Sequence, residues 1–568
     1  MAVGTTKDGG SQVAAGPGSA PRRPRLSMPP SAAGLIGAAL GYLAALGPSL
    51  LPRGPLIDVV GSALVACSGY GLAAVVAALA RMAGWRPGRT AQRAGWTAAG
   101  ALWLIAATLT PRSLAAIDAQ AEALGVPPPQ INPVLALGAS VALLAALVVL
   151  GRLLRALGRQ LDRASRWFVP TGRWSMAVGA MAAFAVCAAL VGMALEGTRT
   201  FYQALDASQD GQSPPTLDTR SGGPSSTVAW DGLGYRGRAF VTGGPTREQL
   251  VAFAGEPAVE PVRAYVGLAQ GQSADDRAEN AVAELARLGG FARANLVLAI
   301  PTGTGWIDAH AIDAAELLLG GDVATVGIQY SYLPSWFSFI ADRPLAVASS
   351  EAVIDAVLDA VAVLPPEQRP KVWLFGESLG AYGGQGALAG QSPAEVVRPG
   401  SIDGAVWVGS PYTSSLWADW RENRAGGPIW QPDIGRGAVA QAFIEAEELT
   451  DPPPRWQGRR IALVAHPNDP VAWWNGSLAG WPAEWLRDPL GPGVDPSLRW
   501  WPIATFWRVG LDLAAAATTP PGSGHLYPES TADAMGAVLT ADSWNAEVGR
   551  RLNAALDELG VEDTPWAR

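Results

Sequence analysis

One serine in the chain has neighbours that suit a catalytic nucleophile. Ser378 is the centre of GESLG (376–380), a G-x-S-x-G motif that directly follows the apolar run KVWLF (371–375). In this motif a strand turns sharply into a helix, and its glycines leave room where the backbone is crowded. With 67 glycines the motif alone can arise by chance, so the preceding strand and the small residues that follow carry the argument. We predict Ser378 as the nucleophile and Gly376 and Gly380 as the glycines of the turn.

A serine nucleophile needs a base, and the chain has three histidines to offer. Where a nucleophile stands on such a turn, the chain order is serine, acid, histidine, which excludes His310. His525 lies in the glycine-rich segment GSGHLY before a C-terminal helix, and a loop there could bring an imidazole over the serine. His466 ends a strand, which fixes its direction. We predict His525 as the base and His466 as a supporting or packing residue.

The acid that orients the base should end a strand between Ser378 and His525. Asp469, in the segment HPNDP, comes directly after the expected strand 460–466. We therefore predict Asp469 as the acid. An aspartate that caps a turn before Pro470 is the competing interpretation. The alternatives, none of which directly follows an expected strand, are Asp419, Asp433 and Asp451.

Two backbone N–H groups are expected to bind the negative oxygen of a reaction intermediate. One belongs to Leu379, and the other to a loop after an earlier central strand. The candidate loop is PTGTGW (301–306), with Thr302 or Gly303 as the donor. Glycines in an ordinary turn would give the same pattern. Glu377 is interpreted as a local hydrogen-bonding residue rather than an acid catalyst.

Residues 231–568 must form the elements that position these groups. Continuous apolar strands that alternate with helices predict an α/β domain with a mainly parallel sheet. The segment before it, 198–230, is rich in Ser, Gly and Pro and predicts a linker. The expected strands are 238–243, 262–269, 295–301, 324–332, 371–375, 403–410 and 460–466, and the expected helices are 273–288, 349–363, one from about 379, and 532–558.

The first third of the chain has a different composition. Hydrophobic residues make up 49% of the 568 residues and charged residues only 16%, against about 25% charged in a typical soluble protein. The apolar excess lies in stretches that approach or exceed the ~20 residues needed to cross a membrane. We expect a disordered tail over 1–30 and an all-α membrane domain over 31–197. The expected spans are 31–51, 57–80, 94–111, 133–154 and 174–195.

The distribution of charge predicts an orientation. Residues 1–196 hold 16 Lys and Arg against 6 Asp and Glu, whereas the remainder holds 25 against 43. Arginines are frequent in the tail and in the second and fourth loops between the expected spans, and scarce in the first and third. By the positive-inside rule, this pattern predicts a multi-pass protein of the cell membrane, with its N-terminus in the cytoplasm and an acidic α/β domain outside.

Together these features resemble an actinobacterial family of membrane-anchored α/β-hydrolases, in which a multi-span N-terminal domain precedes an exported catalytic domain. The resemblance covers about residues 30–560. It implies an α/β-hydrolase fold and serine hydrolase activity without naming a substrate. The sequence keeps the expected residues at all three triad positions. The matching segments are PTGTGW (301–306), QYSYLPSW (329–336), FGESLGA (375–381), VGSPYTSS (408–415), HPNDPV (466–471) and GHLY (524–527).

Tryptophans are concentrated between Asp469 and His525, which predicts a Trp-rich cap over the site. Trp suits surfaces that are half apolar and half wet, and it can stack on a sugar. Packing within the cap is the competing interpretation. With anchoring at the outer face, the cap favours an acyl-ester or lipid-linked substrate of the cell envelope. The tryptophans are Trp473, Trp474, Trp481, Trp485, Trp500, Trp501 and Trp507.

Several other classes of function have little support. The only cysteines are Cys67 and Cys187, both in expected spans, and three scattered histidines leave little from which to build a metal site. No dinucleotide fingerprint precedes an expected helix and no Walker A sequence is present, and an acidic domain argues against nucleic acid. We expect no cofactor. Gly37 and Gly41 form a GxxxG pair, which permits close packing within the bundle or self-association of the chain.

The sequence therefore predicts a serine esterase, lipase or acyltransferase that works through an acyl-enzyme. Hydrolysis and acyl transfer differ only in the acceptor of the second step, which the sequence does not distinguish. A non-catalytic envelope scaffold with a hydrolase-like outer domain is the alternative.

Overall fold

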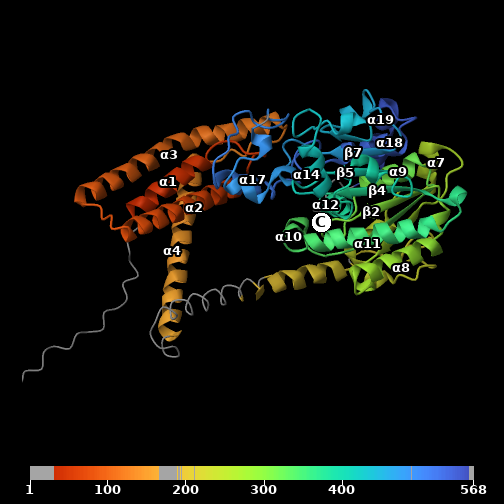
Figure 1. The fold of residues 1–568 in the computed structure, drawn as a ribbon, viewed down its shortest axis with the longest axis horizontal. Helices are drawn as coiled ribbons and strands as arrows, with labels where there is room; N and C mark the ends of the chain where they lie inside the picture. The colour runs from red at the N-terminus through yellow and green to blue at the C-terminus, as the bar shows by residue number, and fades with distance from the viewer. Residues whose placement is uncertain are drawn as a thin grey trace, which may run out of the picture.

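The computed structural model describes residues 31–165, 195–209, 211–487 and 489–561, together with residues 189, 192 and 193. Long N-terminal helices lie at one end of the molecule and an α/β domain at the other (Figure 1). The predicted tail over 1–30 and nearly all of the fifth predicted span, 174–195, lie outside the described residues.

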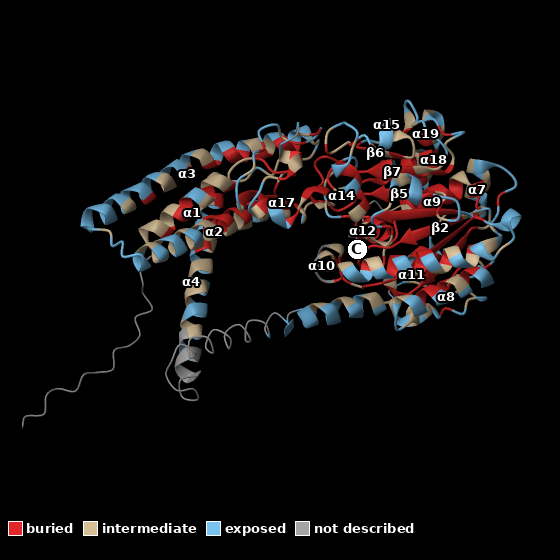
Figure 2. Cartoon of the chain, viewed as in Figure 1, coloured by how far each residue is buried: buried red, intermediate tan, exposed pale blue. Residues whose placement is uncertain are grey.

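Three of the described helices are long and apolar enough to cross a membrane, by length and composition. They correspond to the second, third and fourth predicted spans. Their surfaces are largely exposed, as apolar helices that face lipid would be (Figure 2). The N-terminal helices are α1 (Ala32–Ala45), α2 (Pro55–Met82), α3 (Arg89–Ala123) and α4 (Pro133–Ser165).

The first predicted span, 31–51, is shorter as a helix than the sequence suggested. Helix α1 has 14 residues and ends at Ala45, where the backbone becomes extended. Pro48 and Pro52 follow, and proline disfavours continuation of a helix. Residues 46–54 instead form a loop, here named the α1–α2 loop, whose Leu50 is fully buried.

The GxxxG pair of α1 faces α2 of the same chain. An ideal Cβ on Gly37 would lie 2.3 Å from the Gly69 carbonyl oxygen, and one on Gly41 would lie 2.5 Å from the Val65 carbonyl oxygen. Gly69 is equally close, since its Cβ would lie 2.1 Å from the Gly37 carbonyl oxygen. These glycines let the two backbones touch, which is the packing use of such pairs.

We predict that Gly69→Ala separates α1 from α2, because its methyl group would meet backbone rather than a movable side chain. Gly71→Ala is the matched control, since an added Cβ there has no neighbour within 4 Å. Both changes gain about 1 kcal/mol of helix propensity. Thermal unfolding of the purified protein should show a lower midpoint for Gly69→Ala only. Equal midpoints for the two variants would contradict this packing.

The described part of the α/β domain contains a seven-stranded, fully parallel sheet, in the order β1-β3-β2-β4-β5-β7-β6. Its strands are almost entirely buried, as expected for a parallel sheet covered on both faces (Figure 2). The strands are β1 (Val262–Val266), β2 (Asn295–Ile300), β3 (Val323–Ile328), β4 (Lys371–Glu377), β5 (Gly404–Val408), β6 (Ala440–Phe443) and β7 (Arg460–Val464).

Helices cover both faces of the sheet (Figure 1). One group packs together on one face: α8 (Ala274–Arg287), α11 (Arg343–Ala362) and α12 (Leu379–Ala387). A second group packs on the other: α9 (Ala309–Leu318), α18 (Pro528–Leu539) and α19 (Ala546–Leu559). Shorter helices are α6 (Gly234–Thr242), α7 (Arg247–Ala254), α10 (Ser335–Ala341), α13 (Pro393–Val396), α14 (Ser415–Glu422), α15 (Glu447–Thr450), α16 (Pro470–Trp473) and α17 (Ala504–Asp512).

Three sequence predictions for residues 231–568 differ from this fold, and the predicted linker over 198–230 is helical as far as residue 207. The expected strand 238–243 was wrong, because it lies mostly in helix α6, where Gly237, Phe240 and Val241 are buried at helical spacing; a short apolar run fits either element. Edge strand β6 was not predicted. The expected helix 532–558 is two helices, α18 and α19, separated by residues 540–545.

Candidate active site

Strand β4 turns into helix α12 at Ser378, in a backbone conformation that few residues adopt. Ser378 has φ 54° and ψ −118°, and positive φ in a non-glycine residue is a strained conformation found often at functional sites. The flanking glycines are required by sterics. An ideal Cβ on Gly376 would lie 2.6 Å from the Gly380 carbonyl carbon, and one on Gly380 would lie 2.2 Å from the Ile300 carbonyl oxygen.

The acid and the base predicted from the sequence are in direct contact. The His525 Nδ1–H donates to Asp469 Oδ2 at 2.7 Å. Asp469 is completely buried and also accepts from the Val471 backbone N–H at 2.7 Å. Because the carboxylate accepts only, it fixes the tautomer in which Nε2 of His525 is free to take a proton.

Tyr527 is a third partner of Asp469, which the sequence analysis did not single out. Its hydroxyl donates to Asp469 Oδ2 at 2.6 Å and accepts from the His466 backbone N–H at 3.1 Å. Its signal in the sequence is its place in the matching segment GHLY, in which only His525 is predicted to have a role. Tyr527 adds one more donor to a buried carboxylate, whose charge is costly to bury without hydrogen bonds.

Gly409 connects this pair to the nucleophile. The Ser378 backbone N–H donates to the Val408 carbonyl at 2.9 Å, so the end of β5 lies beside the turn. Gly409 follows with φ 56°, and an ideal Cβ there would lie 2.4 Å from His525 Cε1. The imidazole therefore occupies the space that a side chain at position 409 would fill. Gly409 was also missed, although it lies in the matching segment VGSPYTSS.

His525 Nε2 is buried and has no hydrogen-bond partner among the described residues. The structure therefore contains no hydrogen bond between this nitrogen and Ser378. Catalytic hydrogen bonds are often long or misaligned before substrate binds. The Ser378 side chain is largely buried as well, with a relative exposure of 7% for the residue.

The two predicted oxyanion donors of the PTGTGW loop differ. The Thr302 backbone N–H donates to the Trp306 carbonyl at 2.8 Å, so it is already occupied. Within the described residues, neither the Gly303 nor the Leu379 backbone N–H has a partner. The loop adjoins the nucleophile, since Gly380 packs directly against the Ile300 carbonyl that precedes it. Of the three predicted donors, Gly303 and Leu379 thus keep an unoccupied N–H group in the described part of the chain.

Glu377 is buried below the nucleophile and interacts with a second carboxyl group. Burial raises its pKa well above the ordinary value, and the charge of Asp308, a hydrogen bond with Asp308 and the charge of Asp469 raise it further. A protonated Glu377 can share its proton with Asp308. Asp308 in turn caps helix α9 by accepting from the His310 backbone N–H at 2.9 Å.

His466 packs beside the acid and base. Its ring stacks on Tyr527 with centroids 4.0 Å apart, and its Nδ1–H donates to the Gly524 carbonyl at 2.9 Å. Burial lowers the pKa of His466 to about 4, so this ring is neutral at physiological pH. Its contacts are those of a residue that holds the loop of His525. The alternative acids Asp419, Asp433 and Asp451 are all exposed.

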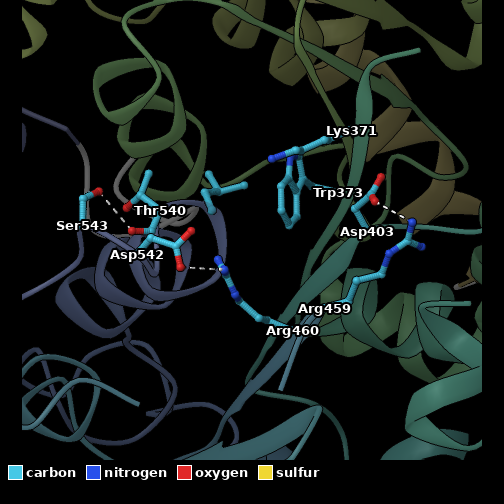
Figure 3. Close-up of a pocket in the computed structure, with 10 residues that line it drawn as sticks. Lys371, Trp373, Asp403, Arg459, Arg460, Thr540, Asp542 and Ser543 are labelled. Atoms are coloured by element: carbon cyan, nitrogen blue, oxygen red, sulfur yellow. Dashed lines mark hydrogen bonds and ion pairs between the residues drawn. The ribbon is translucent and has the colours of Figure 1, made fainter. Parts of the chain in front are cut away.

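A pocket of about 360 Å³ lies elsewhere, at the amino ends of β4, β5 and β7. Figure 3 shows two of its arginines held by carboxylates, Arg459 by Asp403 at 2.9 Å and Arg460 by Asp542 at 3.6 Å. Ser378 stands at the opposite, carboxyl edge of the sheet, where open α/β folds place their ligands. This pocket is separate from the candidate site. No cluster of three His, Cys, Asp or Glu residues suited to a metal occurs among the described residues.

A parallel sheet with a nucleophile turn and a His–Asp pair at its carboxyl edge defines the class of α/β-hydrolases. The chain belongs to the alpha/beta-hydrolase family, whose sequence model matches residues 262–552, and the model of that family's N-terminus matches residues 46–245. No curated protein and no solved structure matches the chain.

We predict that Gly409→Ala impairs the site, because its Cβ would push the His525 ring from its place. A displacement of about 1 Å can cost ~10²-fold in rate, and we expect a loss of that size in the rate at which a serine-directed probe modifies the protein. Gly400→Ala is the matched control: it also has positive φ, 84°, but nothing within 4 Å of an added Cβ. Equal rates for both variants would refute this role of Gly409.

Proposed function

We propose that the protein is a membrane-anchored serine hydrolase that uses Ser378, His525 and Asp469 as a catalytic triad. One observation carries the proposal. The His525 Nδ1–H is hydrogen-bonded to Oδ2 of buried Asp469 at 2.7 Å. The same imidazole lies against Gly409, beside the strained turn that bears Ser378. Strain of this kind persists only where the surrounding structure enforces it.

In the proposed reaction the Ser378 hydroxyl attacks an ester carbonyl while His525 Nε2 accepts its proton. The Leu379 and Gly303 N–H groups bind the oxygen that becomes negative. The imidazolium then returns the proton to the leaving alcohol, and an acyl-enzyme on Ser378 remains. Asp469 stabilises the imidazolium and stays ionised. Water completes a hydrolysis, whereas a second alcohol completes an acyl transfer.

For the substrate we propose an acyl ester of the cell envelope, presented at the outer face of the membrane. Three apolar helices support membrane association, and the arginine pattern of the loops supports a cytoplasmic N-terminus. Trp481 and Trp501 are more than half exposed, which suits residues that contact a membrane interface. They belong to the segment that packs on the N-terminal helices.

The catalytic proposal predicts that Ser378→Ala abolishes labelling by a fluorophosphonate probe, because that reaction needs an activated serine. Wild-type and variant proteins should be compared in membranes at equal expression, with Ser410→Ala as a control that removes another buried serine at the carboxyl edge. Labelling of wild type and Ser410→Ala, but not of Ser378→Ala, is expected. Absence of any Ser378-dependent labelling in a folded wild-type protein would favour the non-catalytic scaffold.

The substrate proposal predicts faster turnover of long-chain esters embedded in lipid vesicles than of short soluble esters. Trp481→Ala and Trp501→Ala should reduce this preference and leave short-ester turnover unchanged, because their rings are exposed at the surface. A clear preference of the wild-type protein for short soluble esters would refute the assignment of a lipid-linked substrate while leaving the triad intact.

A further inference from the structure

The segment between the acid and the base, residues 470–524 and here named the insert, packs on the N-terminal helices through α17 (Figure 1). Trp507 and Ala504 of the insert pack with Ala45 of α1 and Val65 of α2. Leu50 of the α1–α2 loop belongs to the hydrophobic core of the α/β domain. The two parts of the molecule therefore share apolar packing as well as a chain connection.

At the centre of this contact a carboxylate of the insert binds the α1–α2 loop. Asp512, at the end of α17, is completely buried. Its Oδ2 accepts from the Ser49 hydroxyl, from the Leu50 N–H at 3.0 Å and from the Leu51 N–H at 3.4 Å. Three donors on one oxygen fix the loop geometrically. We name this contact the Asp512 clasp.

Other contacts hold the α1–α2 loop in place independently of Asp512. Gln120 of α3 donates to the Ser49 carbonyl at 2.9 Å and to the Leu50 carbonyl at 3.2 Å. Two arginines, Arg53 of the loop and Arg508 of α17, are buried close to Asp512 and offset its negative charge. The clasp is thus a built polar site between two elements, in which three donors of the loop converge on one carboxylate oxygen of the insert.

On the insert side of the clasp, a short turn connects Asp512 to Ala516, which binds the backbone of His525. Turns of helical type follow Asp512, with the Ala515 N–H donating to the Asp512 carbonyl at 2.9 Å. The carbonyl of Ala516, the residue after Ala515, accepts from the His525 backbone N–H at 2.7 Å. Helix α17 is also tied to the acid side, since Trp474 Nε1–H donates to the Phe506 carbonyl at 3.1 Å.

We infer that the α1–α2 loop positions the catalytic base through the Asp512 clasp, so that the membrane domain is a working part of the active site and not only its anchor. This inference rests on the proposed triad. Asp512 is a positioning residue: it touches neither Ser378 nor His525, and acts through Ala516. Loss of the clasp would let α17 and the Ala516 carbonyl shift, and the imidazole would shift with them.

The test uses the full-length protein in lipid nanodiscs, with kcat and KM measured on a soluble ester. Asp512→Ala should lower kcat by about tenfold to 10²-fold with little change in KM, as expected for a misplaced catalytic group. Asp512→Asn should lower kcat less than Asp512→Ala does, because its amide oxygen can still accept hydrogen bonds from the loop. Ser49→Ala removes one donor of three and should lower kcat less than Asp512→Ala does. If Asp512→Ala fails to fold, Ser49→Ala still tests the inference.

Glu284→Ala is the matched control for general destabilisation. Glu284 is also a fully buried carboxylate that binds a distant segment, accepting from the hydroxyls of Ser221, Ser226 and Thr227. It should lose thermal stability but keep kcat at temperatures where it is folded. The inference is overturned if folded Asp512→Ala and Ser49→Ala keep the wild-type kcat, if Glu284→Ala loses kcat equally, or if Asp512→Asn is no better than Asp512→Ala. Absence of Ser378-dependent activity in the wild type would instead overturn the proposed function.

Discussion

The close approach of helix α12 to the end of strand β2 is the constraint on which the candidate site depends. Only glycine fits at position 380, because any Cβ would lie 2.2 Å from the Ile300 carbonyl oxygen. This approach forces the sharp turn that gives Ser378 its positive φ. It also brings the PTGTGW loop beside the nucleophile, since that loop begins directly after Ile300. The proposed nucleophile and the proposed oxyanion donors are therefore placed by one backbone contact.

The parallel sheet places the other residues of the candidate site in a similar way. Strands β2, β4, β5 and β7 end at one edge. Their ends carry in turn the PTGTGW loop, Ser378, Gly409 and the segment of Asp469. Burying Asp469 there is tolerable because its oxygens accept from His525, Tyr527 and the Val471 N–H. The carboxylate that orients His525 is thereby itself oriented, so the His525–Asp469 pair is held in place without substrate.

The apolar N-terminal part of the chain and the acidic α/β domain are joined by a polar contact in an otherwise apolar region. Apolar packing alone is not directional, whereas three donors on Asp512 Oδ2 define one arrangement. The charges of Asp512 and Arg508 favour each other, although burial still lowers the pKa of Arg508 to about 9. A contact of this kind suits a role in positioning better than a role in anchoring, for which the apolar helices suffice.

The sequence by itself determined the α/β class, the parallel strands, the apolar N-terminal helices and the three triad candidates. These are properties of local patterns: apolar strands, a glycine-bounded serine, and an aspartate and a histidine in the expected order. The sequence misled where a short apolar run has no decisive period: α6 was predicted as a strand, and β6 was not predicted. Only the tertiary structure decided the roles of Gly409 and Tyr527, the occupation of the Thr302 N–H, and the contact of Asp512 with a loop more than 400 residues earlier. Contacts between distant segments leave no periodic signal in one sequence, because nothing local requires them.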